Sequence, residues 1–201
     1  MATKNNLNYT EICRDALKIM LSIKDGAHNV EHIVRVYDWS RELAKNYPKT
    51  DLNVLKVAAY WHDVGRKYES EKTDNHNILS GNMVEEYLTK KEASKDFISK
   101  VKDAVVNHSF TFKSKNIEGK IVHDADKLAF LPAHTIPDAY ESMKEGYETK
   151  SFNRKRLVNA LREYLKNKEY LYRGLLLKES KAYYRKIENS FISTLKKVID
   201  K

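Results

Sequence analysis

Apolar residues recur at spacings of three and four along most of the chain, and this is the period of an α-helix. The stripes predict helices over about 9–24, 29–47, 51–64, 75–90, 94–108, 121–130, 151–166 and 178–199. The pattern is looser over 137–147, and only 110–112 alternates like a strand, which is too short to predict one.

The ends of these helices carry residues that start or stop a helix. Asn29, Asp51 and Ser94 stand where side-chain caps are expected, and Pro48 and Pro132 follow predicted helix ends. Six glycines and three prolines are too few for a turn-rich β protein. The sequence therefore predicts one all-α domain with a C-terminal helical extension.

The net charge of +9 is unevenly distributed along the 201 residues. Residues 1–149 hold 22 basic and 23 acidic side chains, whereas residues 150–201 hold 15 and 5. We expect a near-neutral core over 1–149 and basic helices over 150–201 that pack on the same domain. The basic segment is typical of a solvated helix face, and an anion-facing wall or a nucleic-acid contact are the alternatives.

Cys13 is the only cysteine, so the chain can form neither an internal disulfide nor an all-thiolate metal site. The longest apolar run, Val57–Trp61, is far shorter than the ~20 residues that cross a bilayer. No apolar block followed by a small-residue cleavage site stands near Met1. We expect a cytoplasmic protein without a membrane partner, and the sequence indicates no oligomeric state.

Several histidines and aspartates stand on apolar helix faces, where an unpaired polar group is costly. His62 continues an apolar stripe and is followed at once by Asp63, while His32 lies beside Ile33. Asp126 lies in an otherwise largely apolar segment. One divalent ion would satisfy these two imidazoles and two carboxylates together, and the mixed donors suit Mn²⁺, Fe²⁺, Co²⁺, Ni²⁺ or Zn²⁺ better than Ca²⁺.

Adjacent residues of a helix diverge by about 100° around its axis. His62 and Asp63 can therefore share an ion only near a helix end, and Gly65 marks such an end.

Three motifs, taken in order, resemble the HD-domain metal-dependent phosphohydrolases. They are His32-x-x-Arg35-Val36, Trp61-His62-Asp63-Val64-Gly65 and Asp124-Ala125-Asp126-Lys127-Leu128. The resemblance covers about 25–132 and implies an HD-domain helical bundle around a divalent metal, with a C-terminal extension as in the small single-domain branch. It implies the metal ligands His32, His62, Asp63 and Asp126, with Mn²⁺ favoured among the candidate ions.

His76 and His108 stand where several branches of the family place two further histidines. The resemblance implies that this pair binds a second metal ion or the substrate phosphate. An exposed loop position is the alternative for His76, whereas His108 follows an apolar stripe of its own.

The implied reaction cleaves a phosphoester or phosphoanhydride bond, and the expected substrate is a nucleotide. Asp63 is expected to bridge metals or to act as the base for the attacking water. Arg66, Lys67 and Lys127 are expected to hold phosphate, with catalytic roles for Arg66 and Lys127.

Five other polar residues are expected to have supporting roles. Asp124 is predicted to orient a histidine ligand, and Arg35 to form a structural ion pair. His28 is predicted to be a helix-entry residue, with a place beside the site as its alternative, while His123 and His134 are predicted to be structural or exposed.

Two other functions are compatible with these residues. A relative with two irons would activate oxygen instead of hydrolysing phosphate. A non-enzymatic module would bind nucleic acid or a nucleotide through the basic segment around a structural metal.

Overall fold

The computed structural model describes residues 7–69, 75–109, 114–149 and 152–200, and every regular element within them is helical. These elements are α1 (Tyr9–Met20), α2 (Val30–Ala44), α3 (Leu52–Trp61), the 3₁₀-helix η1 (Val64–Tyr68), α4 (His76–Lys90), α5 (Lys95–Val106), α6 (Ile117–Leu128), α7 (Thr135–Lys144), α8 (Arg154–Lys166), α9 (Glu169–Gly174) and α10 (Lys178–Ile199). The all-α prediction is confirmed. The strand-like residues 110–112 lie outside the described residues.

The predicted caps are present at three helix starts. The side chain of Asn29 accepts a hydrogen bond from the backbone N–H of His32 at 3.0 Å. Asp51 accepts from Asn53 at 2.9 Å, and the Ser94 hydroxyl accepts from the backbone of α5. These short-range interactions explain why the starts of α2, α3 and α5 were predictable.

Some boundaries differ from the prediction. Helix α1 ends at Met20 instead of near residue 24, α6 begins four residues early, and the short α9 was not foreseen. The segment expected to be loose forms α7, which buries Ile136, Ala139 and Met143 on one face. Pro137 does not prevent this helix because it lies in the first turn, where backbone N–H groups have no partner within the helix.

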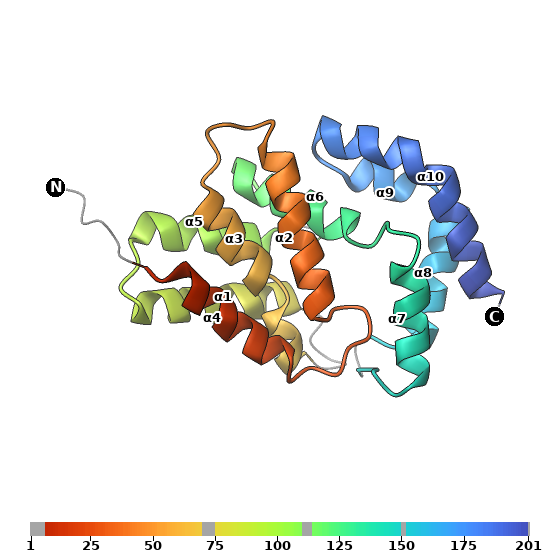
Figure 1. Cartoon of the computed structure of the whole chain (residues 1–201), viewed down its shortest axis with the longest axis horizontal. Coiled ribbons are helices and arrows are strands. Elements are labelled where there is room, and N and C mark those ends of the chain that lie inside the picture. Colours follow the sequence, from red (N-terminus) through yellow and green to blue (C-terminus); the bar gives the residue numbers. More distant parts are fainter. Residues whose placement is uncertain (1–6, 70–74, 110–113, 150–151, 201) are drawn as a thin grey trace.

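Helix α3 lies at the centre of the core. Val54, Leu55 and the run 57–59 along it are fully buried, so this helix is apolar around most of its circumference. It contacts α1, α2, α5 and α6, and Figure 1 shows α2 and α3 beside α6 in the middle of the molecule. This packing brings the end of α3 close to α2 and α6.

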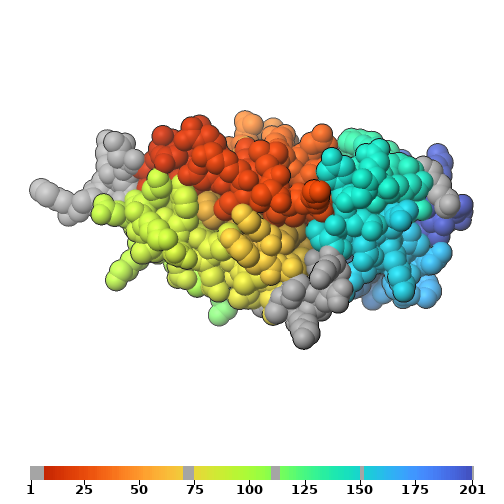
Figure 2. Space-filling model, turned by 90° about the horizontal axis from the view of Figure 1, so that it is seen from below, coloured from red at the N-terminus to blue at the C-terminus, as the bar shows by residue number. Residues whose placement is uncertain are grey.

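Helices α7, α8 and α10 pack on one another, and α10 also contacts α6. Figure 1 shows α7–α10 at the opposite end of the molecule from the N-terminus. The view in Figure 2 shows α7 and α8, in cyan, on the same face as α1 and α4. No described helix is long and apolar enough to cross a membrane. The division at residue 149 stays a prediction.

The basic side chains of the last quarter lie on its outer side. Of the cations described within 150–201, all are exposed except Lys181, which is half-buried. The apolar side chains of the same helices, including Leu157, Leu161 and Leu195, are buried. The described cations of this segment are therefore accessible to solvent, and the choice between a solvated helix face and an anion-binding surface stays a prediction.

Candidate metal centre

Six of the residues expected to bind metal or substrate lie in one cluster, although they come from five parts of the chain. They are His32 of α2, His62 and Asp63 at the end of α3, His76 at the start of α4, His108 just after α5 and Asp126 of α6. Helix α3 ends at Trp61 and η1 begins at Val64, so the His-Asp pair occupies the predicted helix end.

Gly65 supports this turn by allowing a close approach between η1 and α4. A Cβ at this position would lie 2.2 Å from the carbonyl oxygen of His76 and 2.6 Å from the backbone nitrogen of Ser80. The Gly65 N–H instead donates to the Ser80 hydroxyl at 2.8 Å. The glycine is required for packing beside the cluster, whereas the sequence indicated only a helix stop.

One side of the cluster contains the four expected primary ligands. The Nε2 atom of His32 lies 3.3 Å from Nε2 of His62 and 3.1 Å from Oδ1 of Asp126. Nε2 of His62 lies 3.3 Å from Oδ2 of Asp63. Ligands about 2.1 Å from one ion are roughly 3.0–3.4 Å apart when they occupy neighbouring positions. These spacings match ligands that converge on a single ion.

The other oxygen of Asp63 faces the two additional histidines. Its Oδ1 atom lies 3.4 Å from Nε2 of His76 and 3.8 Å from Nε2 of His108. The two imidazole nitrogens are 3.2 Å apart. Asp63 thus presents one oxygen to each half of the cluster, which is the arrangement of a carboxylate that bridges two ions.

The chemistry of Asp63 itself fits a metal. Its side chain is only 1% exposed, and neither oxygen forms a hydrogen bond with the described residues. The Arg66 Nε lies 2.9 Å from Oδ1, close enough for an ion pair but not aligned as a hydrogen bond. Arg66 is thus the cation that lies against Oδ1, whereas Oδ2 lies against the imidazoles of His32 and His62 and has no hydrogen bond. A metal ion shared with these imidazoles would offset the cost of burying Oδ2.

Two of the histidines are held in the tautomer that binds a metal. Nδ1 of His62 lies 2.8 Å from the carbonyl oxygen of Ala59, and Nδ1 of His108 lies 2.6 Å from that of Val105. A carbonyl oxygen only accepts, so each Nδ1 carries the hydrogen. The lone pair on each Nε2 then faces the cluster.

The carboxylates of the cluster are ionised. Burial alone would raise the pKa of Asp63, but Arg66 and His62 outweigh it and hold that pKa well below its usual range. Burial would also raise the pKa of Asp126, but Lys127 and His32 outweigh it and hold that pKa well below its usual range. Both groups therefore carry the negative charge that a divalent ion requires at neutral pH.

The imidazoles respond differently to the same burial. Burial lowers the pKa of His32 to about 4, despite the neighbouring Asp126. Burial also lowers the pKa of His108 well below its usual range. For His62 the contact with Asp63 outweighs burial and raises the pKa. His32 and His108 are thus neutral at pH 7, as metal-binding imidazoles must be.

Two of the three expected phosphate-binding cations lie at the cluster. Besides Asp63, Arg66 lies 3.4 Å from Glu69 and 3.3 Å from Nε2 of His76. Lys127 is buried, lies 3.0 Å from Asp126 and donates to the carbonyl oxygen of His108. Lys67 is exposed and lies over the Tyr68 ring at 5.8 Å, so the structure does not bring it into the cluster.

Asp124 does not orient a metal-ligating histidine. Its carboxylate accepts the backbone N–H groups of Leu176 and Leu177, at 2.9 and 2.8 Å, and pairs with Nδ1 of His123. It therefore fastens the segment between α9 and α10 to α6. Of the other histidines, His123 is buried in this structural contact and His134 is exposed before α7, as predicted.

Arg35 has the expected structural role and forms an ion pair. Its Nε donates to the carbonyl oxygen of Ala129 at 3.1 Å, and the ion-pair partner at 3.8 Å is the exposed Glu31.

His28 combines the two roles that the sequence left as alternatives. It directly precedes the cap of α2, yet its ring is 5.7 Å from the ring of His32. Asp25 holds its Nδ1 at 3.0 Å, and the same carboxylate accepts the backbone N–H groups of Ala27 and His28. The sequence did not predict the Asp25–His28 pair or the contact of Glu69 with Arg66. The signal that could have found them is the spacing of three residues between oppositely charged or hydrogen-bonding side chains in each pair.

A model of the family described as HD domain matches residues 29–131, just over half of the chain. This range contains His32, the His62–Asp63 pair and Asp126 in the family's order. The chain belongs to the HD domain family. The resemblance seen in the three motifs is thereby confirmed.

Solved structures share the HD fold of this chain. A protein from Lactobacillus plantarum has a TM-score of 0.69 and 20% identity, over 98% of this chain and 96% of that chain. A predicted HD superfamily hydrolase from an uncultured Thermotogales bacterium has a TM-score of 0.58 and 24% identity, over 78% and 88%. Bacillus subtilis YpgQ, solved in complex with ADP, has a TM-score of 0.64 and 18% identity, over 95% and 96%. No curated protein matches.

Proposed function

We propose that this HD protein is a metal-dependent phosphohydrolase that cleaves a phosphoester or phosphoanhydride bond of a nucleotide. The observation that carries the proposal is the placement of Asp63, with one oxygen toward His62 and the other toward His76. Such a buried carboxylate between imidazoles is typical of a hydrolytic metal centre.

His32, His62, Asp63 and Asp126 would hold one divalent ion, for which Mn²⁺ is our first choice. His76 and His108, with the second oxygen of Asp63, would hold another ion or the substrate phosphate. A divalent ion supplies Lewis-acid activation of water and offsets the charge of the phosphate. We also propose a cytoplasmic location, which a single buried cysteine favours.

The protein side chains divide the remaining tasks. The lowered pKa of Asp63 makes it a weak proton acceptor, which favours the bridging role over that of a base. Arg66 is only 11% exposed and stays charged, because Asp63 and its other acidic neighbours outweigh burial and raise its pKa. Its guanidinium can bind two phosphate oxygens at once, and it already lies beside His76.

Two observations favour a nucleotide over other phosphate compounds. A structural relative of the same fold, YpgQ, was solved with ADP. A cleft lined by aromatic rings also opens beside the cluster, at His28 and Lys127.

The test is a panel of nucleoside mono-, di- and triphosphates, cyclic nucleotides and p-nitrophenyl phosphate, assayed with Mn²⁺. We expect Asp63→Ala to lose at least about 100-fold in turnover, while Asp38→Ala, an exposed aspartate of α2, keeps it. Equal turnover in wild type and Asp63→Ala would refute the proposal.

The same preparations separate the other candidate functions. Two bound irons together with an oxygen-dependent reaction would identify an oxygenase. Salt-sensitive binding of nucleic acid without turnover would identify a binding module.

A further inference from the structure

A cleft of 650 Å³ lies between the helical core and the C-terminal helices. The core contributes His28, Lys127 and Phe130 to its lining, and α8 contributes residues from Leu157 to Tyr164. Its volume lies within the range of about 300–1,000 Å³ that is usual for small-molecule sites. None of the six cluster residues lines the cleft itself. Lys127 contacts Asp126, and the His28 ring lies 5.7 Å from the His32 ring, so the inner end of the cleft adjoins the metal cluster.

The lining of this cleft is mainly apolar and rich in rings. Six of its eighteen residues carry a ring, namely His28, Phe130, Phe152, Tyr164, Tyr170 and Phe191. Most of the others are Ala, Leu or Ile. Aromatic walls favour a flat ring through stacked or edge-to-face contacts, as well as through burial of apolar area.

The inner end of the cleft is held rigidly. The His28 ring meets the Phe152 ring edge-to-face at 4.9 Å and the Phe130 ring at 5.6 Å. The Phe130 ring in turn stacks on His32 at 4.5 Å. Because Asp25 fixes His28, the aromatic wall has a set position relative to the metal ligands.

The polar side chains of the lining are His28, Lys127, Glu163, Tyr164, Asn167 and Tyr170, and those near the cluster are engaged with protein partners. Lys127 binds Asp126 and the His108 carbonyl, whereas Glu163 and Asn167 lie on exposed parts of α8 and just beyond it. The hydroxyl of Tyr164 is paired with that of Tyr184. The inner end of the cleft therefore offers broad apolar contact, and the side-chain groups that could distinguish one ring from another by hydrogen bonding lie at its exposed end.

We infer that this cleft binds the organic part of the substrate and that this part is a planar aromatic ring, such as a nucleobase, held by apolar contact. The inference rests on the proposed function, because it places the phosphate of the same molecule at the metal cluster. It goes further in stating that the enzyme accepts nucleotides as a class and does not select the base.

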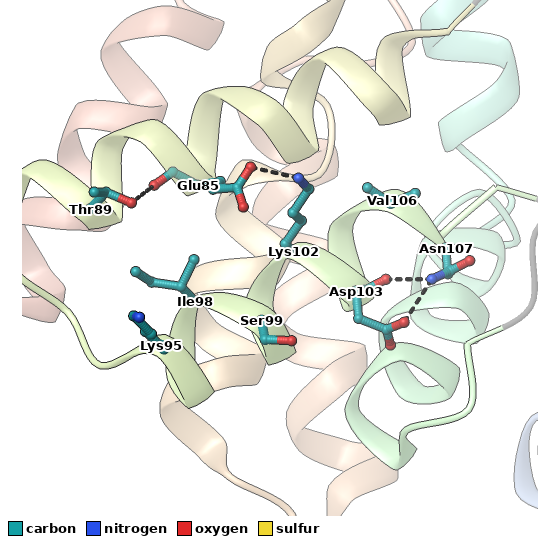
Figure 3. A pocket seen from close by; sticks show the side chains of 9 residues that line it. All are labelled: Glu85, Thr89, Lys95, Ile98, Ser99, Lys102, Asp103, Val106 and Asn107. Atoms are coloured by element: carbon teal, nitrogen blue, oxygen red, sulfur yellow. Dashed lines mark hydrogen bonds and ion pairs between the residues drawn. The ribbon is translucent and has the colours of Figure 1, made fainter.

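The groove between α4 and α5 differs in these respects. It has a volume of 490 Å³, and its lining consists mainly of polar and charged side chains. Figure 3 shows that several of its polar side chains pair with one another, as in Lys102 with Glu85 at 2.5 Å and Asn107 with Asp103 at 2.9 Å. It carries no comparable ring wall.

The test uses two tryptophan substitutions on the same helix. Ala160 is exposed on α8 and lines the cleft, so Ala160→Trp fills the cleft without entering the core. Asn159 is also exposed on α8 but faces a neighbouring groove, so Asn159→Trp is the matched control.

Steady-state kinetics with Mn²⁺ compare ATP, GTP, CTP, UTP, inorganic tripolyphosphate and decyl phosphate, and calorimetry measures binding of ADP.

We expect KM values of the four nucleotides to agree within about fivefold and to lie at least about tenfold below that of tripolyphosphate. Ala160→Trp should raise the nucleotide KM and the ADP Kd at least about tenfold and leave tripolyphosphate hydrolysis unchanged. Asn159→Trp should change none of these values by more than about twofold.

Several results would overturn the inference. One is a nucleotide KM that Ala160→Trp leaves unchanged, and another is an equal rise in the KM of tripolyphosphate in that variant. A lower KM for decyl phosphate than for nucleotides, or a change of oligomeric state caused by Ala160→Trp alone, would also overturn it. If wild type binds ADP but hydrolyses nothing, and Ala160→Trp abolishes that binding, the cleft assignment stands and the proposed hydrolysis fails.

Discussion

Asp124 is one of the contacts that attach the C-terminal helices to the core, beside the Tyr47–Glu179 hydrogen bond and the Trp39–Tyr183 ring contact, and Asp124→Asn tests its share. The fully buried carboxylate accepts the backbone N–H of Leu177 at 2.8 Å, and that of Leu176 at 2.9 and 3.1 Å. Asparagine keeps the size of the side chain. It replaces one accepting oxygen with an NH₂ group that faces backbone donors.

The loss in free energy of unfolding caused by Asp124→Asn can be worked out from these hydrogen bonds. A hydrogen bond to a charged group contributes about 1.5–3 kcal/mol, and a neutral one about 1 kcal/mol. Losing one bond and weakening the others lowers the free energy of unfolding by about 2–4 kcal/mol. For a protein of this size each kcal/mol corresponds to about 2–4 °C, so we expect Tm to fall by ~4–16 °C.

Thermal unfolding followed by circular dichroism measures this change. Asp138→Asn, at an exposed position of α7, is the control and should shift Tm by less than about 2 °C. Trypsin should also cleave within 152–200 faster in Asp124→Asn, because the many exposed cations of that segment are its sites. An unchanged Tm with an unchanged cleavage rate would show that Asp124 contributes nothing to holding the extension.

Three further predictions follow from the site. Arg66→Lys should lower kcat/KM about 10–100-fold, because lysine cannot contact Asp63 and a phosphate together. The control Lys67→Ala should keep kcat/KM within about twofold of wild type. Equal effects of the two substitutions would contradict the different positions of the two cations. His108→Ala should reduce turnover more than His123→Ala, since only His108 faces Asp63, and the reverse order in the same assay would be inconsistent with this geometry. His28 and backbone contacts outweigh burial and lower the pKa of Asp25. Ionised Asp25 therefore stabilises the fold fully above about pH 4, and this stabilisation is lost as the pH falls below that value. The Tm difference between wild type and Asp25→Asn should shrink from pH 7 to pH 3, and a constant difference would argue against an ionised Asp25.

The helices and the primary ligands could be predicted because their signals are local. Caps such as Asn29 act within three residues, and apolar periodicity places His62 on an inward face. The adjacency of His62 and Asp63 required a helix end, and α3 ends at Trp61. Family order then added His76, which the pattern alone left between a loop and the site.

The rest depends on contacts between distant segments, which periodicity does not encode. Asp124 meets Leu176 and Leu177 across more than fifty residues. The aromatic wall joins His28 to Phe130 and Phe152, which lie in three separate segments. Lys67 illustrates the converse, because a cation next to the motif in sequence is exposed on η1 and lies outside the cluster.

The central claim is that Asp63 joins two halves of a metal-binding cluster. Anomalous X-ray diffraction from crystals soaked in Mn²⁺ tests it most directly. We expect an anomalous peak about 2.0–2.3 Å from Nε2 of His32 and His62 and from carboxylate oxygens of Asp63 and Asp126. Ordered density for these side chains without an anomalous peak among them would contradict the account.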